Sequence, residues 1–123
     1  MFALLMGLKT VSPVELMRQV RERAVTVLDV NSPQRWEAAH VPGALNLDPQ
    51  TYTADQLPVD REAGLVFYCS YPMCRKAPQA ARRAKGMGYA NVRVMAAGIT
   101  GWLDAGLPVE GGGLSPAGTV PLS

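Results

Sequence analysis

The chain has few of the residues that build disulfide frameworks, metal centres or nucleic-acid interfaces. Its 123 residues include 2 cysteines and 1 histidine, too few for a disulfide scaffold or a four-ligand zinc site. A net charge of +2 is too small to indicate a nucleic-acid partner, and we expect none. Because 48% of the residues are hydrophobic, the chain can bury one core and form a single domain.

A short apolar segment, residues 1–8, opens the chain. It is too short to cross a bilayer, and it lacks the basic region and cleavage site of a secretion signal. We interpret this segment as a first strand docked on a sheet. The alternatives are an N-terminus cut from a longer chain or the remnant of an anchor. With no targeting signal, we expect no membrane partner and a location in the reducing cytoplasm.

Further apolar segments predict the strands of that sheet. Residues 24–30 and 64–69 are nearly continuous apolar runs, as expected of parallel strands that are buried on both faces. Residues 91–95 predict another strand, and a short strand is expected after the turn at Pro42-Gly43.

Helix signals alternate with these strands. Ser12 as N-cap, Pro13 in the first turn and Glu15 three residues after the cap predict a helix with a capping box. Further helices are predicted over residues 33–39, 76–87 and 99–105, with a helical turn within residues 48–62. The alternation indicates a three-layer α/β/α fold, in which right-handed crossovers place helices on both faces of a mostly parallel sheet. We expect one domain over residues 9–110 and a flexible tail over residues 111–123.

Cys69 is the candidate catalytic residue. It ends the buried segment 64–69, and a polar loop leads from it to Arg75 and the next helix. Ligands of open α/β sheets bind beyond the carboxyl ends of the strands. Backbone N–H groups at the helix start, together with Arg75, would lower the pKa of the thiol and hold an anion. A buried structural cysteine is the alternative, but a strand that stops at Cys69 before a polar loop favours a functional role.

Several ordered motifs resemble the rhodanese family, and the resemblance covers residues 11–109. The motifs are Leu28-Asp29-Val30, Trp36 to Ala44 with His40-Val41-Pro42-Gly43, Phe67-Tyr68-Cys69, Gly88-Tyr89-Ala90-Asn91-Val92, and Ala97 to Trp102. The resemblance implies a rhodanese-like fold with a five-stranded sheet. It also implies a sulfurtransferase that works through covalent, two-step catalysis.

In the implied reaction, the Cys69 thiolate takes a sulfur atom from a small sulfur anion, such as thiosulfate, or from a persulfide. Cys69 becomes a persulfide and passes the sulfur to a thiol or to a protein acceptor. The chemistry implies neither a metal nor an organic cofactor. A sulfur carrier or a non-enzymatic interaction module on the same fold is an alternative.

The expected substrate-binding loop departs from the usual family pattern. Five residues stand between Cys69 and Arg75 where the usual rhodanese loop has four: Ser70, Tyr71, Pro72, Met73 and Cys74. The longer loop resembles that of the related cell-cycle phosphatases and arsenate reductases, so either activity is an alternative. Those relatives usually carry His where this chain has Tyr68. The loop also has no glycine, and Pro72 has no N–H, both of which disfavour a phosphate cradle.

Cys74 is a candidate resolving thiol, because it lies five residues after Cys69 in the same loop. It could attack a persulfide or form a reversible disulfide, or it could be an incidental residue at the helix start; both interpretations stay open. A permanent disulfide is not expected, since it would block the nucleophile.

Other residues are expected to support or wall the site. Asp29 is predicted to hold loop N–H groups, and His40 to hydrogen-bond the backbone around the Pro42-Gly43 turn. Asn31 stands where the family commonly has an arginine, so one positive charge is missing. Trp36, Tyr71 or Met73 are candidates for the pocket wall, although core packing is the preferred interpretation for Trp36 and Trp102.

Overall fold

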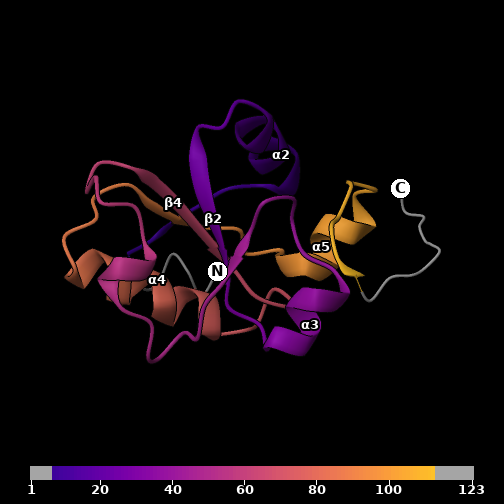
Figure 1. The fold of residues 1–123 in the computed structure, drawn as a ribbon. Coiled ribbons are helices and arrows are strands. Elements are labelled where there is room, and N and C mark those ends of the chain that lie inside the picture. The colour runs from indigo at the N-terminus through magenta and orange to yellow at the C-terminus, as the bar shows by residue number, and fades with distance from the viewer. Residues whose placement is uncertain (1–6, 113–123) are drawn as a thin grey trace.

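A computed structural model describes residues 7–112 of the chain, and Figure 1 shows its fold. The elements are β1 (Lys9–Thr10), α2 (Pro13–Arg21), β2 (Val25–Asp29), α3 (Pro33–Ala38), β3 (Leu45–Asn46), the 3-10 helix η1 (Ala54–Gln56), β4 (Gly64–Tyr68), α4 (Lys76–Gly86), β5 (Val92–Val94) and α5 (Gly98–Asp104). Their order confirms the predicted alternation of strands and helices.

The five strands form one parallel sheet in the order β1-β5-β4-β2-β3. The longest pairing joins β2 to β4, from Val25 opposite Gly64 to Asp29 opposite Tyr68. The carboxyl ends of these two central strands therefore lie side by side. That edge of the sheet is where the sequence predicts the site.

Two hydrophobic cores cover the two faces of the sheet, because successive side chains of a strand point to opposite faces. In β4, Leu65 and Phe67 pack in the core under α4, whereas Val66 and Tyr68 pack in the core under α2 and α5. Figure 1 shows α4 on one side of the strands and α2 on the other. The three-layer prediction is confirmed.

The first helix begins as its sequence predicts, with one difference. Ser12 caps α2 by accepting a hydrogen bond of 3.1 Å from the Glu15 N–H, and Pro13 is the first helical residue. The Glu15 carboxylate, the expected other half of a capping box, instead pairs with Arg18 one turn on. The hydrogen bond and charge of Arg18 lower the pKa of that carboxyl.

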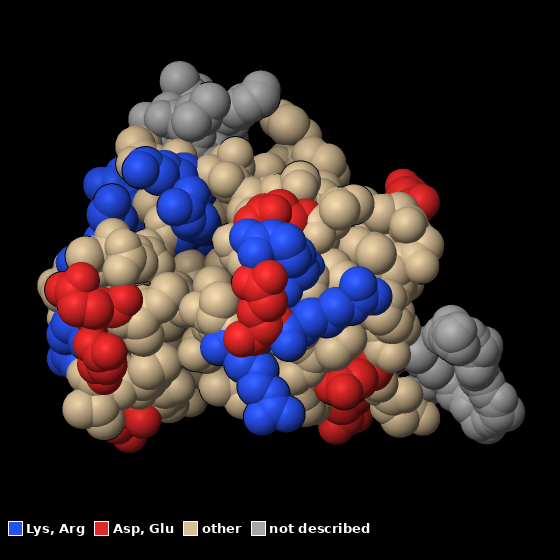
Figure 2. Space-filling view, turned by 90° about the horizontal axis from the view of Figure 1, so that it is seen from above, with Lys and Arg blue, Asp and Glu red and all other residues tan. Residues whose placement is uncertain are grey.

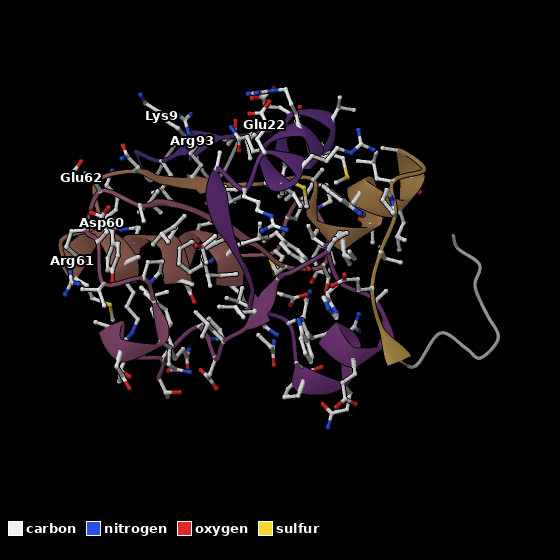
Figure 3. The ribbon with its side chains drawn as sticks, turned by 45° about the horizontal axis from the view of Figure 1, so that its top comes forward. Lys9, Glu22, Asp60, Arg61, Glu62 and Arg93 are labelled. Atoms are coloured by element: carbon white, nitrogen blue, oxygen red, sulfur yellow. A yellow bond between two sulfur atoms is a disulfide. The ribbon has the colours of Figure 1, made fainter. Side chains whose placement is uncertain are left out.

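The predicted strand at residues 1–8 lies mostly outside the described residues. Within the described part, Leu8 is buried in the α4-side core, and the first strand begins at Lys9. Lys9 pairs in register with Arg93 of β5, and Figure 3 shows the two side chains together at this edge of the sheet. The predicted flexible tail lies outside the described residues from residue 113 onward.

The surface of the described chain carries both signs of charge. Figure 2 looks onto the α2 side, where basic and acidic side chains alternate across the middle of the face. The Arg18 guanidinium lies between Glu15 and Glu22 there. Across residues 7–112, each helix is too short or too polar to span a bilayer.

Candidate active site

Cys69 follows the last residue of β4 and is 3% exposed, with its side chain in the α4-side core. The backbone after it is tied to the first turn of α5. Ile99 N–H donates to the Cys69 carbonyl at 2.9 Å, and Thr100 N–H donates to the Ser70 carbonyl at 3.0 Å. Two of the first amides of α5, which lack a partner within the helix, are thus satisfied by the residues that begin the loop.

Gly98 allows this close approach of the loop to α5. Its φ is +69°, and a Cβ atom there would lie 2.7 Å from the Ser70 carbonyl carbon and from the Tyr71 nitrogen. Any other residue would therefore strain its backbone and push the loop away. The glycine of the Gly98–Trp102 motif positions the Cys69 loop, a role that the sequence analysis did not assign. Trp102 anchors the same helix, buried, with its indole N–H donating to the Pro108 carbonyl at 2.7 Å.

Cys69 and Cys74 are joined by a disulfide across the loop, with their Cα atoms 6.5 Å apart. A permanent disulfide is not expected from the sequence, whereas a reversible one is among the open interpretations of Cys74. The pairing shows that the Cys74 sulfur reaches the Cys69 sulfur without any rearrangement of the described backbone. A resolving role requires this reach.

The loop itself is an ordinary turn. Cys74 N–H donates to the Tyr71 carbonyl at 3.0 Å, and α4 begins at Lys76, directly after Arg75. Within residues 7–112, the one non-glycine residue with a positive φ is Arg23, so residues 70–75 all avoid the left-handed region. A cradle of amides that all point inward tends to need left-handed positions, so the geometry disfavours the phosphatase-type alternative.

Below the loop, Tyr68 and Asp29 form a buried polar contact. The Tyr68 hydroxyl donates to the Asp29 carboxylate at 2.6 Å and accepts from the Val41 N–H at 3.0 Å. Asp29 also accepts from the Asn31 N–H at 2.8 Å. Burial raises the pKa of the Asp29 carboxyl, and these hydrogen bonds offset part of the rise; burial also raises the pKa of Tyr68. Asp29 thus holds the backbone N–H of Asn31, in the loop that follows β2.

Asn31 connects the end of β2 to the loop. Its side-chain oxygen accepts a hydrogen bond of 2.5 Å from the Ser70 hydroxyl, and both residues are buried. Asn46 of β3 donates to the Asn31 carbonyl at 2.9 Å and to the Asp29 carbonyl at 3.0 Å. From the sequence, Asn31 is notable only as a missing positive charge, because no local pattern indicates its contact with Ser70.

His40 bonds the backbone, but not at the turn where this was predicted. Its Nδ1 lies 2.6 Å from the Trp36 carbonyl, and its ring stacks on the Trp36 ring. The turn is held by Glu110 instead, whose carboxylate accepts from the Gly43 N–H at 2.8 Å. Glu110 also pairs with His40 through two backbone hydrogen bonds, so the segment after α5 closes over the turn.

A cavity of about 400 Å³ opens beside the cysteine pair. Its lining residues come from the loop, the first turn of α4 and the end of β5: Cys69, Tyr71, Pro72, Met73, Cys74, Ala77, Pro78, Val94, Met95 and Ala96. Tyr71 and Met73 wall it, as predicted. Trp36 does not; it packs against His40 and donates to the Ala44 carbonyl at 2.8 Å. Among residues 7–112, no three His, Cys, Asp or Glu side chains gather as metal ligands.

The chain matches the family described as Rhodanese-like domain over residues 12–105 and belongs to that family. It is 35% identical over 103 residues to the HTH-type transcriptional regulator Rv0324 of Mycobacterium tuberculosis, a match that covers 83% of this chain and 45% of the regulator. The chain thus spans less than half the length of that relative.

Two further proteins are similar to this chain. The thiosulfate sulfurtransferase GlpE of Actinobacillus succinogenes is 26% identical over 85% of this chain and 93% of its own length. The crystal structure of the BH2092 protein from Bacillus halodurans superposes with a TM-score of 0.78 at 22% identity, covering 85% of this chain and 78% of that one. That likeness shows the shared fold.

Proposed function

We propose that this protein is a sulfurtransferase that carries sulfane sulfur as a persulfide on Cys69. The observation that carries the proposal is the position of Cys69: at the carboxyl end of the central strand, beside a cavity, with a second thiol in reach. The family assignment and the likeness to GlpE support the same chemistry. The phosphatase and arsenate reductase alternatives are less well supported, because residues 70–75 have none of the left-handed positions that a cradle of inward-pointing amides tends to need.

The first half-reaction begins from the reduced pair. The Cys69 thiolate attacks the outer sulfur of the donor, the sulfur–sulfur bond of the donor breaks, and the leaving group departs with the electron pair. With thiosulfate, the products are the Cys69 persulfide and sulfite. In the second half-reaction, an acceptor thiolate attacks the terminal sulfur and restores the Cys69 thiolate, which predicts ping-pong kinetics.

Cys74 provides a second route by which the sulfane sulfur can leave Cys69. Its thiolate attacks the inner sulfur of the Cys69 persulfide, the Cys69–Cys74 disulfide forms, and hydrosulfide leaves. The sulfane sulfur is reduced by two electrons as the two thiols are oxidised. An external dithiol then opens the disulfide by exchange. This cycle suits a reducing compartment such as the cytoplasm.

Mass spectrometry of the reduced protein after treatment with thiosulfate or an organic thiosulfonate tests the proposal. We expect cyanide-dependent turnover in the wild type that is lost in Cys69→Ser. The Cys69 peptide of Cys74→Ser should retain one added sulfur atom, whereas the wild type without an acceptor should convert that sulfur to hydrosulfide and form the Cys69–Cys74 disulfide. Equal turnover in Cys69→Ser contradicts the proposal, and no added sulfur on Cys74→Ser together with no hydrosulfide from the wild type points to a non-enzymatic module.

A further inference from the structure

A second cavity, the polar cavity, lies where β2 and β3 end and α4 begins. It has a volume of about 430 Å³, within the range of small-molecule sites, and is lined by residues 30–33, 46–50, 76 and 79. The start of α4 separates it from the cavity beside the cysteine pair, which residues 77 and 78 line instead. Among the described residues, the two cavities share no lining residue, and neither cysteine lines the polar cavity. It is therefore a separate place for a ligand.

Two opposite charges line the polar cavity without pairing with each other. Lys76, the first residue of α4, has no ion pair or side-chain hydrogen bond within residues 7–112. Asp48, from the segment after β3, accepts the Gln50 N–H at 2.8 Å and the Thr51 N–H at 3.2 Å through one carboxylate oxygen, so its carboxylate is held in place. A cation and an anion that face one cavity from different elements are complementary to a ligand that carries both charges.

Amide groups complete the polar lining. Gln50 and Gln79 line the cavity, and within the part of the chain that the structure describes neither side-chain amide has a hydrogen-bond partner. Asn46 is different, because its amide N–H groups donate to the Asn31 carbonyl at 2.9 Å and to the Asp29 carbonyl at 3.0 Å and fix that wall. The two glutamines can therefore donate to, and accept from, an amide or hydroxyl group of a ligand.

We propose that the polar cavity binds a zwitterion of the amino-acid type, whose carboxylate pairs with Lys76 and whose ammonium pairs with Asp48. An amide of the ligand bonds Gln50 and Gln79. The binding site goes beyond the proposed sulfur chemistry, because it uses neither cysteine. It lies next to that chemistry all the same: Asn31 lines the polar cavity, and its side chain accepts from the hydroxyl of the residue that follows Cys69.

Titration of the nitrogen-15-labelled protein with L-glutamine and with glycyl-L-glutamine, followed by NMR, tests this inference. We expect saturable shifts of the backbone amides around the polar cavity with at least one of the two probes. Two analogues of L-glutamine each lack one charge: L-glutaminamide has no carboxylate, and N-acetyl-L-glutamine has no ammonium. Each analogue should bind at least about threefold more weakly than L-glutamine, as expected for the loss of one exposed ion pair.

Lys76→Met should weaken the binding of L-glutamine at least about threefold but leave that of L-glutaminamide unchanged, because this analogue has no carboxylate to lose a partner. Asp48→Asn keeps an oxygen for the Gln50 and Thr51 N–H groups and should weaken L-glutamine but not N-acetyl-L-glutamine. Lys85→Met is the matched control, since Lys85 lies exposed on the same helix and does not line the polar cavity; it should change nothing.

Cys69→Ser should bind the probes as tightly as the wild type, so the outcome does not depend on sulfur transfer. If neither probe binds, or if L-glutamine and its two analogues bind equally well, the inference is overturned and the sulfurtransferase proposal is untouched. Binding that neither Lys76→Met nor Asp48→Asn weakens also overturns it, because the ligand then lies elsewhere.

Discussion

The Tyr68 hydroxyl donates a 2.6 Å hydrogen bond to the Asp29 carboxylate, joining the carboxyl ends of the two central strands. Tyr68 immediately precedes Cys69, so this contact fixes the point from which the loop departs. The same hydroxyl accepts from the Val41 N–H, which ties the His40–Ala44 segment to the sheet. One buried phenol therefore holds three segments that are distant in the sequence.

Tyr68→Phe should lower the free energy of unfolding by about 3 kcal/mol, because it leaves a buried carboxylate and a buried N–H without this partner. Urea unfolding followed by circular dichroism measures the change. Tyr71→Phe is the control: Tyr71 lies exposed on the loop, and its change should stay within about 0.5 kcal/mol. Equal effects of the two substitutions would show that the Tyr68 hydroxyl adds nothing.

Asp29 predicts a pH dependence of stability. Burial raises the pKa of its carboxyl in the folded protein above the ordinary value of 3.8, so the folded state binds the proton more tightly. The free energy of unfolding should therefore fall as pH rises from 3.8 to the raised folded value, by about 1.4 kcal/mol for each pH unit between the two.

Asp29→Asn removes the titrating carboxyl. The free energy of unfolding of this variant should therefore lack the part of the pH dependence that Asp29 causes. Urea titrations of both proteins between pH 3 and pH 7 give the comparison. The wild type should lose stability relative to Asp29→Asn as pH rises through this window. A relative gain would contradict the raised pKa.

The close approach of Gly98 to the loop predicts a large effect of one methyl group. Gly98→Ala adds a Cβ atom 2.7 Å from the backbone of Ser70 and Tyr71, and it also forces alanine to a φ of +69°. We expect a loss of about 3 kcal/mol in unfolding free energy, with slower persulfide formation on Cys69 as the loop shifts. Thermal unfolding and single-turnover persulfidation measure both effects.

Gly106→Ala separates the cost of the positive φ from the cost of the close contact with the loop. Gly106 has a φ of +75°, but an added Cβ atom meets no heavy atom within 4 Å. The backbone cost alone is about 1 kcal/mol, with no change at Cys69. If both alanine variants behave alike, the approach of Gly98 to the loop does not matter.

Local patterns in the sequence were enough to predict the layered fold and the position of Cys69. The apolar run that becomes β4 ends at Tyr68, so the cysteine had to lie at a strand end. The site contacts depend instead on residues brought together by the fold: Tyr68 with Asp29, and Ser70 with Asn31, each pair 39 residues apart. The prediction for His40 placed its bond at the wrong backbone group because the return of Glu110 to the turn has no local signal.

The contact between Ser70 and Asn31 predicts coupled substitutions. Ser70→Ala and Asn31→Ala each remove a 2.5 Å hydrogen bond between buried side chains, so their effects should not add. A double-mutant cycle on urea unfolding should give a coupling energy of about 1 kcal/mol. Ser70→Ala with Asn91→Ala, whose side chain bonds the Glu62 carbonyl elsewhere, should be additive. Additivity in both cycles would mean that Asn31 does not hold the loop.

Cys74→Ser separates the two routes by which sulfur leaves Cys69: transfer to an external acceptor and release as hydrosulfide. Without the second thiol, persulfide still forms on Cys69, but the disulfide and its hydrosulfide product cannot form within the chain. After a single turnover with no acceptor present, the wild type should release hydrosulfide and gain the Cys69–Cys74 disulfide, whereas Cys74→Ser should retain the added sulfur on Cys69. A sulfide-sensitive electrode and mass spectrometry of the loop peptide follow the two products. Equal hydrosulfide release from both proteins would assign Cys74 no part in the reaction, although the fold places its sulfur against that of Cys69.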